Sequence, residues 1–102
     1  MYQEIKNKIV ELLGGLEYDK ILLFGSRARG ENRSDSDYDV IVVLKDNLER
    51  NEILKIESII SKSFAQELID IDIIVKTSEQ YDYLKDKIGN VIYYADEYGV
   101  AL

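Results

Sequence analysis

The order of apolar patterns along the chain predicts an α/β (α+β) fold with a small mixed β-sheet of three to four strands flanked by helices. Apolar residues at helical spacing alternate with short runs of strand length, giving the order helix, strand, strand, helix, strand, helix. The 102 residues suffice for one small domain with one core. We therefore expect a single domain over residues 1–102.

The first half of the chain predicts one helix and two strands. Apolar residues recur at helical spacing over residues 3–13, with Lys and Glu between them, and Gly14-Gly15 supplies a C-terminal stop. Residues 21–24 and 40–44 are short apolar runs, each of strand length.

The second half predicts another helix and a third strand. From about residue 48 to 66, apolar side chains fall on one helical face, with Lys, Glu and Ser opposite. Residues 68–75 alternate with period two, so Asp70 and Asp72 fall on one face of this strand and isoleucines on the other.

The C-terminal part predicts a last helix. Thr77 followed by Gln80 resembles a capping box, which favours a helix running to Ile88. Residues 91–94 fit either a short extended piece or a continued helix. The chain contains no proline, no repeat and no low-complexity tract that would mark a domain boundary.

The charge distribution argues against a nucleic-acid ligand and for a small phosphate ester. Twenty acidic and thirteen basic residues give a net charge of −7, which repels a polyanion over most of the surface. Three of the four arginines nevertheless lie within residues 25–39, namely Arg27, Arg29 and Arg33. Positive charge is therefore local, as binding a small phosphate ester requires.

Several classes of chemistry are excluded by composition. Without cysteine or histidine, the chain can form no disulfide, thiolate metal site, Ser-His triad or zinc site of the usual kind. Any acid-base or metal chemistry must therefore use carboxylates. No apolar stretch approaches the ~18 residues that span a bilayer, and the N-terminus lacks an apolar signal core, so we expect a cytoplasmic protein that contacts no membrane.

Residues 25–39 carry the strongest functional pattern. A Gly-Ser turn follows an apolar run, and two carboxylates at i and i+2, Asp37 and Asp39, precede the next one. A P-loop is rejected because Glu31 and Asn32 stand where it needs Lys and Ser or Thr.

A calcium loop is also disfavoured at this segment. It would need glycine at its sixth position and glutamate at its twelfth, where Val40 and Asp46 stand. Phosphoryl or nucleotidyl transfer with two metal ions remains. Asp37 and Asp39 at the start of a strand would project from one face with Cα atoms roughly 6–7 Å apart, so both carboxylates can reach metals ~4 Å from each other. Oxygen ligands favour Mg²⁺, with Mn²⁺ as an alternative.

The motifs GSRARG and SDSDYDVIVV resemble the signature of the nucleotidyltransferase superfamily that includes DNA polymerase β. The small size and the arginines in the turn are most similar to its minimal nucleotidyltransferases, the MNT or MntA domains. The resemblance implies a nucleotidyltransferase-like fold and a third carboxylate on a later strand. Both Asp70 and Asp72 are flanked by isoleucines, and we favour Asp72 because a longer apolar run follows it.

The resemblance also implies how the site residues act. Gly25 and Ser26 would offer backbone amides, and the serine its hydroxyl, to the β- and γ-phosphates of ATP at a helix start, with Arg27 or Arg29 adding charge. Two Mg²⁺ ions would be held by Asp37 and Asp39. The metal that activates the acceptor hydroxyl would be bound by Asp72, before in-line attack on the α-phosphorus.

The implied activity is transfer of a nucleoside monophosphate, AMP from ATP, to a hydroxyl. Similar minimal proteins act as antitoxins that modify a tyrosine of a HEPN-type toxin, so such a toxin is the expected partner. Two alternatives stay open. One is a binding module that neutralises a partner by occlusion, and the other is a transferase acting on a small molecule such as an aminoglycoside. Five of the eight tyrosines lie in the last quarter of the chain, where either a protein interface or core and rim positions would explain them.

Overall fold

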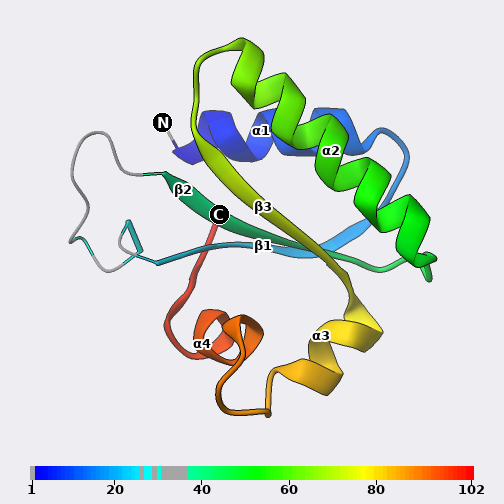
Figure 1. The fold of residues 1–102 in the computed structure, drawn as a ribbon, viewed down its shortest axis with the longest axis vertical. Coiled ribbons are helices and arrows are strands. Elements are labelled where there is room, and N and C mark those ends of the chain that lie inside the picture. The colour runs from blue at the N-terminus through cyan, green and yellow to red at the C-terminus, as the bar shows by residue number, and fades with distance from the viewer. Residues whose placement is uncertain (1, 26, 29, 31–36) are drawn as a thin grey trace.

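A mixed four-stranded sheet with helices on both sides organises the chain (Figure 1). The computed structural model describes residues 2–25, 27–28, 30 and 37–102. In chain order the elements are α1 (Tyr2–Leu13), β1 (Tyr18–Phe24), β2 (Tyr38–Leu44), α2 (Arg50–Gln66), β3 (Ile71–Thr77), α3 (Ser78–Leu84), α4 (Val91–Tyr98) and β4 (Val100–Ala101). Among these residues, no helix is both long enough and apolar enough to cross a bilayer. The predicted fold class is confirmed.

The strands lie in the order β3-β2-β1-β4, with β1 and β2 inside the sheet. Strand β1 pairs antiparallel with β2 and with β4, whereas β2 pairs parallel with β3. A parallel pair needs a crossover connection, and α2 supplies it. Six of the seven residues of β2 are buried, which explains why its sequence is a continuous apolar run after Asp39 rather than an alternating one.

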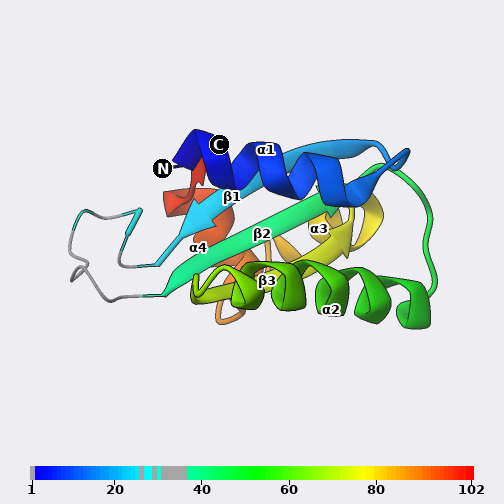
Figure 2. The ribbon, with the colours of Figure 1, turned by 90° about the horizontal axis from the view of Figure 1, so that it is seen from above.

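Helices α1 and α2 cover one face of the sheet, and α3 and α4 cover the other (Figures 1 and 2). Each face has its own apolar core. On the α1/α2 face, Val40 and Val42 of β2 pack with side chains of the two helices, such as Ile9 of α1 and Phe64 of α2. On the α3/α4 face, the core consists of Leu22, Ile41, Val43, Tyr81, Ile92 and Ala95. Alternation along β2 thus decides which face each of its side chains serves.

The strand predicted over residues 68–75 instead spans Ile71–Thr77, because the turn that ends α2 occupies the residues directly after Gln66. The amide of Leu68 donates to the carbonyl of Ala65 at 3.0 Å, and the amide of Ile69 donates to that of Phe64 at 3.1 Å. This pair of hydrogen bonds is a Schellman motif, which requires a left-handed residue at its centre. Leu68 takes that conformation with φ 60°, so the strand begins only at Ile71.

The C-terminal part also differs from the prediction. The capping box of α3 is confirmed, since Thr77 Oγ1 accepts from the Gln80 amide and Gln80 Oε1 accepts from the Thr77 amide. Helix α3 nevertheless ends at Leu84, and residues 91–98 form a separate helix that Asn90 caps. The two-residue strand β4 was not predicted, because only its pairing with β1 distinguishes it from a loop.

The left-handed Leu68 predicts a stabilising substitution. A branched residue at positive φ costs about 1–2 kcal/mol that glycine avoids, while glycine adds flexibility to the unfolded chain. Leu68 is 93% exposed, so its side chain contributes little burial. Leu68→Gly should therefore raise the free energy of unfolding by roughly 1 kcal/mol in urea titrations. Leu68→Ala keeps the Cβ and is the matched control; equal stability of the two variants would contradict the assigned strain.

Candidate active site

Asp39 and Asp72 lie directly opposite each other on neighbouring parallel strands. The register of β2 and β3 pairs Asp39 with Asp72, just as it pairs Ile41 with Ile74 two residues later. Ile41 and Ile74 both belong to the core under α3 and α4. Because side chains two residues apart share a face, the two carboxylates lie on the α3/α4 side of the sheet. Asp39 is half-buried and Asp72 is exposed.

The surroundings of Asp39 disfavour its charged form. Burial raises the pKa of the Asp39 carboxyl, the negative charge of Asp72 and a hydrogen bond shared with it raise this pKa further, and the charge of Asp37 adds to the effect. Asp37, which immediately precedes β2, is exposed. Three carboxylates therefore interact electrostatically at the start of β2, where a bound cation would relieve their repulsion.

Gly25 leaves the space that the Asp39 carboxylate occupies. The residue before it, Phe24, is the cross-strand partner of Asp39. Gly25 has φ 76°, and a Cβ at this position would collide with Oδ2 of Asp39. Only glycine lets the backbone turn here while the carboxylate lies against it. The glycine of the Gly-Ser motif is thus explained by close approach as well as by backbone conformation.

The described part of the segment after Gly25 forms turns, not the expected start of a helix. The amide of Gly30 donates to the carbonyl of Arg27 at 3.3 Å, which closes one such turn. The Arg27 guanidinium lies 3.8 Å from the centre of the Tyr38 ring. This contact fastens the turn to the first residue of β2. Ser26 and Arg29, predicted to bind nucleotide, and Arg33 lie outside the described residues.

Asp70 lies at the same end of the sheet without joining the Asp39 pair. It precedes β3, its carbonyl accepts a hydrogen bond from the Tyr38 amide at 3.0 Å, and its side chain is exposed. The charge acting on Asp39 from β3 is that of Asp72. Of the two alternatives that the sequence left open, Asp72 is therefore the one beside Asp39. The catalytic roles of Asp37, Asp39 and Asp72 remain predictions.

The residues present fit a divalent cation in part. Within the part of the chain that the structure describes, no three acidic side chains are grouped closely enough to hold a metal ion. Asp39 and Asp72 are nevertheless a close pair of oxygen donors, the chemistry that Mg²⁺ and Mn²⁺ prefer. The charge of the exposed Asp37 also acts on Asp39, which makes Asp37 the candidate for a third donor.

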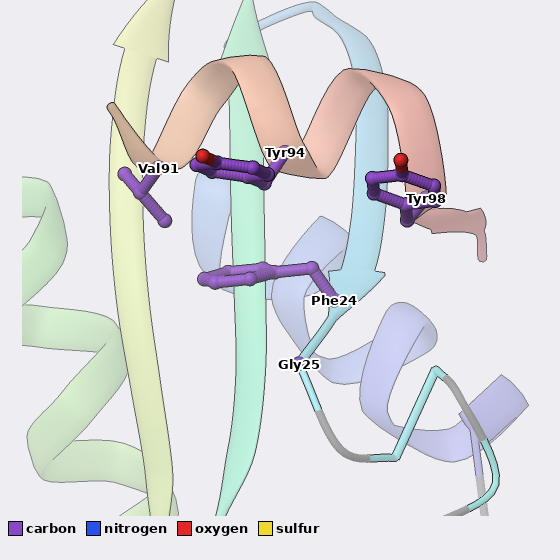
Figure 3. A pocket seen from close by; sticks show the side chains of 5 residues that line it. All are labelled: Phe24, Gly25, Val91, Tyr94 and Tyr98. Carbon is purple, nitrogen blue, oxygen red and sulfur yellow. The ribbon is translucent and has the colours of Figure 1, made fainter. Parts of the chain in front are cut away.

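A cavity of about 430 Å³ opens beside Gly25, between the end of β1 and α4. Figure 3 shows its lining of Phe24, Gly25, Val91, Tyr94 and Tyr98. Four of these residues were not among the predicted site residues. The tyrosine enrichment near the C-terminus was the only signal for them in the sequence, and it did not indicate which tyrosines would face the site.

Comparisons with known proteins find a matching family model and similar folds. The family model described as "Polymerase beta, Nucleotidyltransferase" matches residues 7–98. A protein of Sulfolobus solfataricus whose nucleotidyltransferase activity is inferred shares the fold with a TM-score of 0.58 and 26% identity, over 98% of this chain and 74% of that one. No curated protein matches the chain.

Toxin–antitoxin complexes share the fold as well. A chain of such a complex crystallised with AMP-PNP has a TM-score of 0.55 and 22% identity, over 94% of this chain and 70% of that one. A chain of the tri-AMPylated Shewanella oneidensis HEPN toxin in complex with MNT antitoxin has a TM-score of 0.53 and 20% identity, over 99% of this chain and 71% of that one.

The raised pKa of Asp39 predicts a pH-dependent effect of its removal. Since the folded chain binds a proton at Asp39 more tightly than the unfolded chain, this carboxyl stabilises the fold below its ordinary pKa of about 4, and the contribution is lost as pH rises through the folded-state pKa. In EDTA, Asp39→Asn should therefore be more stable than wild type at pH 7, and the difference should shrink towards pH ~4.

Urea unfolding across this pH range measures the effect. Asp70→Asn removes an exposed carboxyl of the same strand end and serves as the control. If the wild-type chain were more stable than Asp39→Asn at pH 7 in EDTA, the repulsion between the carboxylates would not lower the free energy of unfolding, and the prediction would be wrong.

Proposed function

The chain belongs to the polymerase β nucleotidyltransferase family, and on that premise we propose that it is a Mg²⁺-dependent adenylyltransferase that moves AMP from ATP to a tyrosine hydroxyl of a HEPN-type toxin. The observation that carries the proposal is the pairing of Asp39 with Asp72 beside Gly25. Carboxylates held together against their mutual repulsion are suited to a divalent cation, and a close glycine turn is suited to phosphate.

The proposed chemistry assigns each residue a task. Asp39 and Asp72 would hold the metal ions, with Asp37 as the further ligand, and the ions would neutralise charge on the phosphates. Gly25 and Ser26 would bind the β- and γ-phosphates through their amides, and Arg27 or Arg29 would add positive charge.

The transfer step then needs only a base and a positioned acceptor. The acceptor oxygen attacks the α-phosphorus, the bond between that phosphorus and the β-phosphate oxygen breaks, and pyrophosphate leaves. The proton of the acceptor hydroxyl passes to Asp72, whose exposed position leaves it open to an acceptor on another protein. This route requires no histidine, in agreement with the composition.

The choice of acceptor rests on the relatives. The structures that share this fold include complexes of toxin and antitoxin, one of them with a tri-AMPylated HEPN toxin. Those facts concern other proteins, and they support the proposal that this chain acts as the antitoxin of such a pair.

Label transfer from ATP separates the proposed roles. With Mg²⁺ and a HEPN-type toxin, label from α-³²P-ATP should appear on the toxin, label from γ-³²P-ATP should not, and mass spectrometry should find AMP on tyrosine. Asp39→Asn and Asp72→Asn should each lower the rate at least about 100-fold, because each removes an oxygen ligand of the charged centre. Asp70→Asn should stay within about 3-fold of wild type.

Neutralisation of the toxin by Asp39→Asn, with no label transferred, would instead support the binding module that acts by occlusion. Transfer that depends on Asp70 and not on Asp72 would exchange the roles of the two residues. Circular dichroism of each variant would verify that the loss of transfer does not arise from unfolding.

A further inference from the structure

We propose that the cavity between Phe24 and α4 binds the nucleobase of the nucleotide by aromatic stacking, with little discrimination between purines. This inference rests on the proposed function, since it names the subsite that takes the remainder of the nucleotide. It assigns Phe24 and Tyr94 as the residues that set nucleotide affinity.

The cavity adjoins the carboxylate pair at Gly25. Gly25 lines the cavity, and the same residue lies against the Asp39 carboxylate. Phe24 is the cross-strand partner of Asp39 and packs against the core on the same face of the sheet. This cavity is therefore within reach of the base of a nucleotide whose phosphates lie at Gly25 and Asp39.

The walls suit a flat ring. In Figure 3 the Tyr94 ring lies above the Phe24 ring, both seen nearly edge-on, with Val91 towards one end and Tyr98 towards the other. The volume of about 430 Å³ is within the ~300–1,000 Å³ range of small-molecule sites. Aromatic side chains bind bases by stacking, which every base permits because each has a π-face.

The lining predicts weak selectivity between bases. Among the residues that the structure describes, the five that line the cavity carry no charge, and the tyrosine hydroxyls are their polar side-chain groups. Strong discrimination requires groups that hydrogen-bond the edge of a base. The described lining is rich in aromatic rings and holds no charged side chain, so the base is the part of the nucleotide that fits it best.

Helix α4 holds its side of the cavity in place. Val91, Tyr94 and Tyr98 are spaced i, i+3 and i+7 and share one helical face, while Ile92 and Ala95 are buried against the sheet. The Tyr81 hydroxyl donates to Asp96 at 2.6 Å and ties α4 to α3.

Gly99 fixes the end of the same helix. Its amide donates to the Ala95 carbonyl at 2.8 Å, and a Cβ at this position would collide with that carbonyl and crowd the Leu23 carbonyl of β1. Because only glycine fits between the Ala95 and Leu23 carbonyls, Gly99 allows the end of α4 to pack closely against β1. The cavity wall is therefore preorganised, which lowers the entropic cost of binding a ring.

Binding of nucleotide and of bare triphosphate tests the inference. Using Mg²⁺ and α,β-methylene ATP in calorimetry, Tyr94→Ala should weaken binding at least about 5-fold, as expected for loss of one stacking partner. Binding of inorganic tripolyphosphate should not change. Tyr94→Phe should restore the affinity, and the guanosine analogue should bind wild type within about 3-fold of the adenosine one.

Tyr83→Ala is the control, because Tyr83 is also an exposed tyrosine but lies on α3 and does not line the cavity. Phe24→Leu tests the opposite wall and should weaken the ATP analogue, not tripolyphosphate. Unchanged nucleotide affinity in both cavity variants, with a raised KM for the acceptor protein, would assign the cavity to the acceptor ring and overturn the proposal. A preference above about 10-fold for one purine would overturn its low selectivity.

The two hypotheses fail separately. If Asp39→Asn abolishes transfer while Tyr94→Ala and Phe24→Leu leave nucleotide binding intact, the proposed function stands and the base subsite is refuted. If no variant or wild-type chain transfers label, the proposed function fails, and nucleotide binding still reports on the cavity.

Discussion

The parallel register of β2 and β3 is the constraint on which the site depends. It sets Asp39 directly opposite Asp72, so that two like charges are neighbours at one end of the sheet. The fold maintains this unfavourable pair through the burial of β2 between two apolar cores. Helix α2 fastens the other strand of the pair, since Glu57 Oε2 accepts a hydrogen bond from the Val75 amide at 2.8 Å. The register therefore cannot shift without loss of packing and of this hydrogen bond.

The antiparallel pairing of β1 with β2 brings the remaining parts together. It sets Phe24 opposite Asp39, so the turn that begins at Gly25 starts beside the carboxylates. Side-chain alternation then assigns Phe24 to the face covered by α4, where Tyr94 and Tyr98 lie. The acidic pair, the glycine turn and the aromatic cavity thus adjoin one another because β2 pairs with both β1 and β3 at Asp39.

The sequence predicted the elements better than their contacts. The first helix, the strands through residues 21–24 and 40–44 and the capping box at Thr77 are confirmed, because apolar periodicity and capping are local signals. The strand after α2 was misplaced because a leucine occupies a left-handed position where glycine is usual. Helix α4 was left ambiguous, since the Asn90 cap is a short signal within a tyrosine-rich stretch.

In the candidate site, too, the local features could be predicted from the sequence and the tertiary contacts could not. The spacing of Asp37 and Asp39 at the start of a predicted strand indicated that their carboxylates would be close, and the charge of Asp37 does act on Asp39. The preference for Asp72 over Asp70 rested on the apolar run that follows Asp72, whereas its place beside Asp39 is set by the register of β2 and β3. The cavity required knowledge of how α4 docks over β1, which is set by contacts at Gly99 far from the motif in sequence.

Anomalous scattering from manganese tests the central claim most directly. Crystals grown with Mn²⁺ and α,β-methylene ATP should show an anomalous peak between the carboxylates of Asp39 and Asp72, with the triphosphate reaching the turn at Gly25. Manganese bound at Asp70 with Asp72 unliganded, or nucleotide bound without any peak at Asp39, would contradict the account.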